Sequence, residues 1–156
     1  MGERDSEAAE TSAVLDGASM LSGAVELARD FAATHRLEAG DAARLCILVE
    51  ELVANLSDHG TPGPTPPRLS LLIEAAAIRI RLVDSGKPFD PRRAAAPSPH
   101  QERGGGAGLA IVRAWAEIED YRSDRNGNRL DVRVPLGRGA GGADARSSET
   151  FGGADS

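Results

Sequence analysis

The chain has 156 residues, of which 40% are hydrophobic and 3% are aromatic, a size and composition typical of one domain with an aliphatic core. The formal net charge is −6 and the isoelectric point is about 5.1. This balance excludes the basic surface that nonspecific nucleic-acid binding needs, and it also excludes a polybasic membrane patch.

Both ends of the chain have the composition of disordered segments. Residues 1–11 are charged and lack apolar periodicity, and residues 137–156 are rich in glycine, alanine, serine and aspartate. Such segments bury too little apolar surface to offset the entropy lost on ordering. We therefore expect one folded domain over residues 12–136, with room for a short first strand at 12–16.

Two helices are predicted near the start of the domain. Apolar residues recur at three- and four-residue steps over about 22–36 and, more regularly, over about 41–58. His59 and Gly60 end the second helix. The proline-rich run 61–67 prevents its continuation, because proline lacks the backbone N–H that a helix needs.

Two strands follow, at about 69–74 and 78–82, in which apolar and polar residues alternate. The period of two places Arg79 and Arg81 on a wet face, which is typical of an antiparallel sheet. The next stretch, residues 85–104, is rich in proline and poor in apolar side chains. A loop this long in a compact domain is usually functional or disordered.

A third helix and a hairpin complete the predicted elements. Residues 105–118 form a helical pattern with a glycine-rich start, and residues 124–128 predict a turn between a weak strand at about 118–123 and a clear last strand. The predicted order of elements is two helices, two strands, one helix and two strands. This order indicates an α+β fold. We expect a two-layer sandwich with helices on one face of a mixed or mostly antiparallel sheet.

Several classes of protein are excluded by single features. Cys46 is the only cysteine, so neither a disulfide framework nor a multi-cysteine zinc site is possible. No apolar run reaches the roughly 20 residues of a membrane helix, and no signal peptide is evident. The only lysine, Lys87, precedes a proline, so a Walker A loop is absent. We expect a cytoplasmic location.

Glu51 and Asn55 form the first pattern that could carry chemistry. A spacing of four residues puts the two side chains on one face of the second helix. An amide there could hold a hydrated Mg²⁺ while the carboxylate acts as a base. The alternative is a solvated helix face, which is the commoner origin of such a pair. Glu50 is a second candidate for the base, but the spacing to Asn55 favours Glu51.

Two further patterns concern nucleotides. Asp84, at a strand end, could accept a hydrogen bond from the amino group of a base, and Gly86 would let a ring lie close. The alternative is an ordinary turn. Gly105, Gly106 and Gly108 open the third helix, where free N–H groups and the helix dipole favour phosphate. A flexible hinge is the alternative for this run.

The order and spacing of these motifs resembles the GHKL superfamily of ATP-binding domains, which includes histidine kinases and gyrase. Within it, residues 84–91 (DSGKPFDP) and 105–113 (GGAGLAIVR) look like the motifs of bacterial anti-sigma factor serine/threonine kinases. Residues 126–130 (NGNRL) before the last strand are also typical of these proteins. The resemblance covers about residues 12–136.

The resemblance implies a role for each matching residue. Glu51 would be the general base, and Asn55 would coordinate the Mg²⁺ that bridges the ATP phosphates. Asp84 would bind the adenine amino group, and Gly86 would leave room for the ring. The glycine motif that offers backbone N–H groups to phosphate consists of Gly105, Gly106, Ala107, Gly108 and Leu109.

The same resemblance implies a lid at about residues 87–104, in which Arg103 would meet a phosphate. His59, after the asparagine helix, would also lie near phosphate. The remaining candidates, including Cys46, Trp115 and Tyr121, are interpreted as packing residues.

The function implied is an ATP-dependent serine/threonine kinase that acts as an anti-sigma factor, with ATP and Mg²⁺ as cofactors. It would bind a sigma factor and phosphorylate a serine on an anti-anti-sigma antagonist. The alternative is an ATP-binding regulatory module that sequesters a partner without kinase activity. Glu51 favours the kinase, because a module that only binds needs no base. A homodimer is compatible with the resemblance, whereas direct contacts with nucleic acid or a membrane are not expected.

Overall fold

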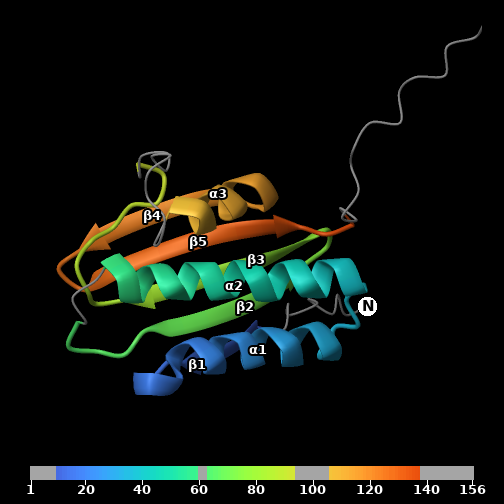
Figure 1. The fold of residues 1–156 in the computed structure, drawn as a ribbon, viewed down its shortest axis with the longest axis horizontal. Coiled ribbons are helices and arrows are strands. Elements are labelled where there is room, and N and C mark those ends of the chain that lie inside the picture. The colour runs from blue at the N-terminus through green and yellow to red at the C-terminus, as the bar shows by residue number, and fades with distance from the viewer. Residues whose placement is uncertain (1–9, 60–62, 94–105, 138–156) are drawn as a thin grey trace, which may run out of the picture.

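Three helices cover one face of a five-stranded sheet (Figure 1). The structure is a computed structural model that describes residues 10–59, 63–93 and 106–137. The elements are β1 (Glu10–Val14), a 3-10 turn (Gly17–Ser19), α1 (Met20–Thr34), α2 (Ala39–His59), β2 (Arg68–Glu74), β3 (Ala77–Asp84), α3 (Gly106–Trp115), β4 (Glu117–Asp124) and β5 (Gly127–Pro135).

The predicted fold class is confirmed. The strand order is β1-β2-β3-β5-β4, and every pairing among the described residues is antiparallel. Figure 1 shows α1, α2 and α3 side by side over the sheet. Among the described residues, no helix is long and apolar enough to cross a membrane.

Two element boundaries differ from the sequence expectation. β1 begins at Glu10 rather than near residue 12, because Glu10 and Thr11 pair with Leu72 and Leu71 of β2. The third helix ends at Trp115, short of the expected residue 118. The backbone from Glu117 onward instead pairs with β5, so strand pairing overrides the helical pattern there.

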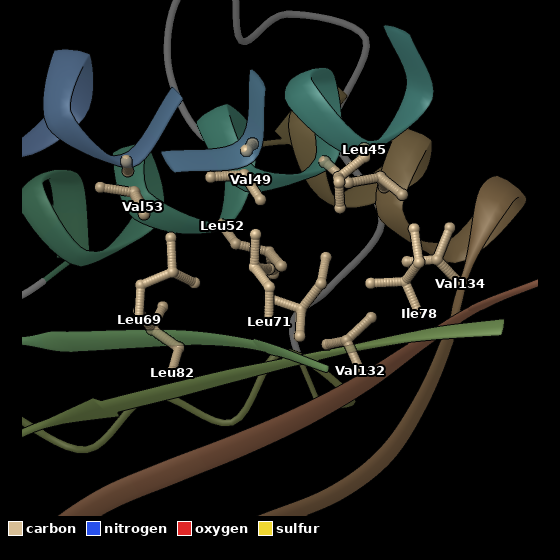
Figure 2. Packing of buried hydrophobic residues seen from close by; sticks show 14 of the residues in the cluster. Leu45, Val49, Leu52, Val53, Leu69, Leu71, Ile78, Leu82, Val132 and Val134 are labelled. Carbon is tan, nitrogen blue, oxygen red and sulfur yellow. The ribbon is translucent and has the colours of Figure 1, made fainter. Parts of the chain in front are cut away.

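The core lies between α2 and the sheet. Buried residues recur along α2 at three- and four-residue steps, which gives the helix one apolar face. Figure 2 shows these side chains facing those of the strands. The labelled members are Leu45, Val49, Leu52 and Val53 of α2, and Leu69, Leu71, Ile78, Leu82, Val132 and Val134 of the strands.

This packing also places the polar residues of interest. Side chains on a strand alternate between faces, so Asp84 at the end of β3 lies on the same side as Leu82, toward the helices. Asn55 follows Leu52 by three residues and continues the buried face of α2. The fold therefore brings the C-terminal end of the buried face of α2 to the end of β3.

The opposite face of the sheet carries ion pairs, of which the pairs on Asp131 are the most buried. Arg81 and Arg129 each donate from Nε to one oxygen of the Asp131 carboxylate, at 2.7 and 2.8 Å. Burial by itself raises the pKa of Asp131. The hydrogen bonds and charges of the two arginines outweigh it and hold the pKa below its usual value.

Replacing Asp131 by asparagine is expected to lower the free energy of unfolding at pH 7 by about 1–3 kcal/mol, because two charged hydrogen bonds are lost. The partly exposed arginines keep the loss below the roughly 3–5 kcal/mol of a fully buried pair. Since the folded-state pKa is lowered, this contribution is complete above the unfolded-state value of about 3.9. It is lost as the pH falls through the folded-state pKa, so the two proteins should converge in acid.

Urea denaturation at pH 7 and at low pH measures this difference. Asp120→Asn is the matched control, because its partner Arg122 has a side chain that is 73% exposed. A loss from Asp131→Asn no larger than that of the control would contradict the assignment.

Candidate nucleotide-binding site

A cavity of about 520 Å³ opens where α2 meets the end of β3. Its walls also include residues from the start of α1, the segment 63–67 and the hairpin of β4 and β5. Most of the lining is apolar, but Asn55, Asp84 and Gly86 all contribute to it. The cavity therefore combines a mostly apolar lining with a few convergent polar groups, as small-molecule sites do.

Asp84 is held in one orientation. Its Oδ1 accepts hydrogen bonds from the backbone N–H of Gly86 at 2.8 Å and from Nδ2 of Asn128 at 2.9 Å. Asn128 lies opposite Asp84 in the pairing of β3 with β5. Both bonds end on Oδ1, so Oδ2 is the oxygen left to accept a hydrogen bond from a ligand.

The turn after Asp84 is fixed by contacts with the segment 63–67. Ser85 Oγ donates to the carbonyl of Thr65 and accepts from the N–H of Thr65, both at 3.0 Å. Gly63 lies so close to Ser85 that a Cβ at Gly63 would collide with its backbone. These contacts between Ser85 and the segment 63–67 hold that segment as one wall of the cavity, beside Gly86.

Asn55 carries a buried amide at the cavity. The residue is 8% exposed, and its Nδ2 has no hydrogen-bond partner among the described residues. A buried donor left unpaired costs about 1–3 kcal/mol. A ligand oxygen in the cavity would satisfy it, and rotation of the amide would present Oδ1 to a cation instead. The site therefore fits a phosphate with its metal ion.

Glu51 lies one turn before Asn55, against the first turn of α3. A Cβ at Gly108 would collide with Oε2 of Glu51, so only glycine leaves space for this carboxylate. Glu51 and Gly108 are not among the residues that line the cavity. Glu50 lies in a separate shallow groove between α1 and α2, with Cys46. Burial raises the pKa of the Cys46 thiol, which keeps it protonated.

The predicted site residues thus fall into three groups. Asn55, Asp84 and Gly86 share the cavity, and Glu51 meets the glycine motif at Gly108. Within α3, Ala107 is exposed and Gly108 and Leu109 are buried, with Gly106 as the first helical residue. Arg103, Gly105 and most of the predicted lid lie outside the described residues, as does the side chain of His59, the last residue of α2.

The first part of the predicted lid is anchored. The N–H of Phe89 donates to Oη of Tyr121 at 2.9 Å, and Arg92 Nη2 donates to the carbonyl of Tyr121 at 3.3 Å. Arg113 of α3 donates to the carbonyl of Pro91 at 2.7 Å. Lys87, Phe89 and Pro91 line the cavity, and these hydrogen bonds tie their segment to β4 and α3.

Sequence reasoning missed the roles of Asn128 and Tyr121. The sequence interpretation places Asn128 in a hairpin turn and in the family motif at residues 126–130, and it treats Tyr121 as a packing residue. Both contact the cavity wall, and the signal for Asn128 is its register: the hairpin turn places it opposite Asp84. Tyr121 had no comparable signal, because the alternation of β4 is weak.

Comparison with known proteins places the chain in a family. The model of the histidine kinase-like ATPase domain matches residues 18–134, well over half of the chain. A search of curated proteins gave no significant match.

Matches among solved structures include a blue-light activated histidine kinase from Erythrobacter litoralis EL346, at 18% identity and a TM-score of 0.45. The match covers 64% of this chain and 32% of that one. A histidine kinase domain of the same protein matches at 16% identity and 0.44, over 76% and 60% of the two chains. The mycobacterial sensor histidine kinase MprB matches at 15% and 0.41, over 83% and 97%.

The present chain thus spans about a third of the first of these kinases and 60% of the second. All three TM-scores are below 0.5, so the assignment rests on the family model. The chain belongs to the family of histidine kinase-like ATPase domains, which bind ATP as kinase or regulatory modules.

Proposed function

We propose that this chain is an ATP-dependent serine/threonine kinase that acts as an anti-sigma factor in the cytoplasm. It would bind a sigma factor and transfer phosphate to a serine of an anti-anti-sigma antagonist. The likeness of residues 84–91 and 105–113 to that branch of the superfamily supports the proposal. The observation that carries the kinase activity is the position of Glu51, against the glycine motif at Gly108 and one turn from Asn55.

Adenine would occupy the apolar part of the cavity. Oδ2 of Asp84 would accept a hydrogen bond from the exocyclic amino group, since Oδ1 is already engaged by Gly86 and Asn128. The lack of a side chain at Gly86 leaves space for the ring beside the turn. A base with a carbonyl at that position would place two acceptors face to face, which disfavours it.

The phosphates would lie between Asn55 and the start of α3. Asn55 would hold Mg²⁺ through its amide oxygen, and the backbone N–H groups at the start of α3 would receive phosphate oxygens. A bound Mg²⁺ supplies positive charge that offsets the charge of the β- and γ-phosphates. Among the described residues, no cluster of three His, Cys, Asp or Glu side chains could hold a metal. Phosphate oxygens and water would therefore complete the coordination.

Glu51 would act on the incoming serine. The serine oxygen attacks the γ-phosphorus, the bond from that phosphorus to the ADP oxygen breaks, and the Glu51 carboxylate takes the hydroxyl proton. Phosphoryl transfer depends mostly on positioning and charge stabilisation, so a correctly placed carboxylate suffices as the base. The products are ADP and a phosphoserine on the antagonist.

Thermal unfolding tests the nucleotide site directly. At a free Mg·ATP concentration 100 times its Kd, the folded state should gain about 2.7 kcal/mol, which raises Tm by several degrees. Mg²⁺ alone should give no comparable shift, and EDTA should reduce the effect of ATP. An unchanged Tm at millimolar Mg·ATP would overturn the proposal. Transfer of labelled γ-phosphate to an antagonist serine then tests the kinase activity.

A further inference from the structure

A chain of hydrogen bonds connects the wall of the cavity to the carboxylate of Asp84. The Phe89 N–H donates to Oη of Tyr121 at 2.9 Å, and that hydroxyl donates to Oδ1 of Asn128 at 3.4 Å. Nδ2 of Asn128 then donates to Oδ1 of Asp84 at 2.9 Å and to the carbonyl of Gly86 at 3.0 Å. The chain joins the segment after β3 to β4, β5 and the end of β3.

The middle members of this chain differ in their burial. Asn128 is 4% exposed, whereas Tyr121 is partly buried and lines the cavity. Burial raises the pKa of the Tyr121 hydroxyl above its usual value, so the group stays protonated and can donate while it accepts from Phe89. Solvent therefore competes weakly for the bonds that Asn128 donates.

The Tyr121 hydroxyl, the Asp84 carboxylate and the Gly86 carbonyl together fix which way the amide of Asn128 points. Because Oδ1 of Asn128 accepts from Tyr121, its Nδ2 must face Asp84 and Gly86. Without the hydroxyl, Oδ1 of Asn128 loses the donor that holds the amide from the side of Tyr121. A rotated amide would place its oxygen against the Asp84 carboxylate and the Gly86 carbonyl, and these acceptors repel one another.

We propose that Tyr121 and Asn128 are positioning residues for base recognition, which orient the Asp84 carboxylate and the Phe89 wall together. This inference rests on the proposed nucleotide binding. It gives the Tyr121 hydroxyl, which is bonded to Phe89 and Asn128, a part in the selectivity for an amino group at the base. The phosphate subsite, which Asn55 and the start of α3 would form, does not depend on the chain of hydrogen bonds through Tyr121 and Asn128. We call this chain the relay.

The test uses three ligands, each with Mg²⁺: ATP, inosine triphosphate and inorganic tripolyphosphate. Inosine triphosphate carries a carbonyl where ATP carries its amino group, and tripolyphosphate has no base. In Tyr121→Phe, the affinity for ATP should fall about 3- to 10-fold, the expected size of one lost hydrogen bond. The preference for ATP over inosine triphosphate should fall by a similar factor. The affinity for tripolyphosphate should stay unchanged.

A double-mutant cycle tests whether the two residues act as one unit. Asn128→Ala should weaken ATP binding at least as much as Tyr121→Phe, and the double variant should bind ATP no worse than Asn128→Ala alone. Ser22→Ala is the control, since it removes an exposed hydroxyl that donates to Ser19 and that does not line the cavity. Thermal unfolding without ligand verifies that each variant is folded.

The outcomes separate the relay from the proposed function. If Tyr121→Phe keeps the parent ratio of ATP to inosine triphosphate affinity, the relay is wrong and nucleotide binding stands. An equal loss for tripolyphosphate would show a general loosening of the cavity, which also overturns the relay. If the parent protein binds no ATP, the proposed function itself fails.

Discussion

Asp84→Asn is expected to weaken ATP binding by a factor on the order of 10², which corresponds to about 2.7 kcal/mol. The Gly86 N–H and Asn128 Nδ2 both donate to Oδ1 of Asp84, so the oxygen of the substituted amide would keep that place. The new NH₂ group would then face the cavity and the amino group of adenine. Two donors in opposition lose the hydrogen bond and leave both groups unpaired.

The same geometry predicts a change of preference. A base with a carbonyl at that position could accept from the new NH₂ group, so Asp84→Asn should bind inosine triphosphate at least as well as the parent does. Competition between the two nucleotides, followed by calorimetry or fluorescence, measures the ratio. A variant that keeps the parent preference for ATP would show that Asp84 does not read the base.

Asp124→Asn provides the matched control for this substitution. Asp124 also accepts from the backbone N–H two residues later, at 2.6 Å from Asn126, but it is exposed in the turn between β4 and β5. The chemical change is identical and the position lies outside the cavity lining. Its nucleotide affinities should equal those of the parent.

Local patterns in the sequence were enough to predict the elements and the positions of Asn55 and Asp84 within them. The period of α2 fixes which face is buried, and with it the place of Asn55 after Leu52. The alternation of β3 likewise puts Asp84 on the core side. The position of each of these two residues follows from the periodicity of a single element. The sequence therefore predicts such positions well.

The rest of the site depends on contacts between elements. Asn128 reaches Asp84 only because the register of β3 and β5 sets them opposite one another. The position of Tyr121 depends on β4, whose polar sequence is a weak strand signal and overlaps the end of a helical pattern. The space that Gly108 leaves for Glu51 follows from the packing of α2 against α3, which no single motif contains. Such relations arise from tertiary packing, where local propensity is a weak guide.

Glu51→Gln is expected to lower the rate of phosphate transfer to the antagonist serine by about 10²–10⁴, the usual contribution of a general base. The glutamine keeps the shape of the side chain beside Gly108 and removes only its ability to take a proton. Binding of Mg·ATP should remain close to that of the parent, because adenine and phosphate are held by other residues. Retention of the sigma factor in a pull-down should also persist, since sequestration needs a surface and no proton acceptor.

Two further variants make the assignment specific. Glu50→Gln should transfer phosphate as fast as the parent, because Glu50 lies in the groove between α1 and α2 and not against α3. Gly108→Ala should fold, since only the end of the Glu51 side chain meets the added Cβ. The displaced carboxylate should nevertheless slow transfer while ATP binding changes little.

Single-turnover transfer of labelled γ-phosphate, measured beside nucleotide affinity, distinguishes the remaining possibilities. Transfer by Glu51→Gln at the parent rate would exclude Glu51 as the base. A parent protein that binds ATP and its partner but phosphorylates no cognate antagonist would instead be a sequestering module. In that protein, Glu51→Gln and Gly108→Ala would alter neither ATP affinity nor partner binding. The contact between Glu51 and Gly108 would then be a packing feature of α2 and α3, because no step that needs a base would depend on it.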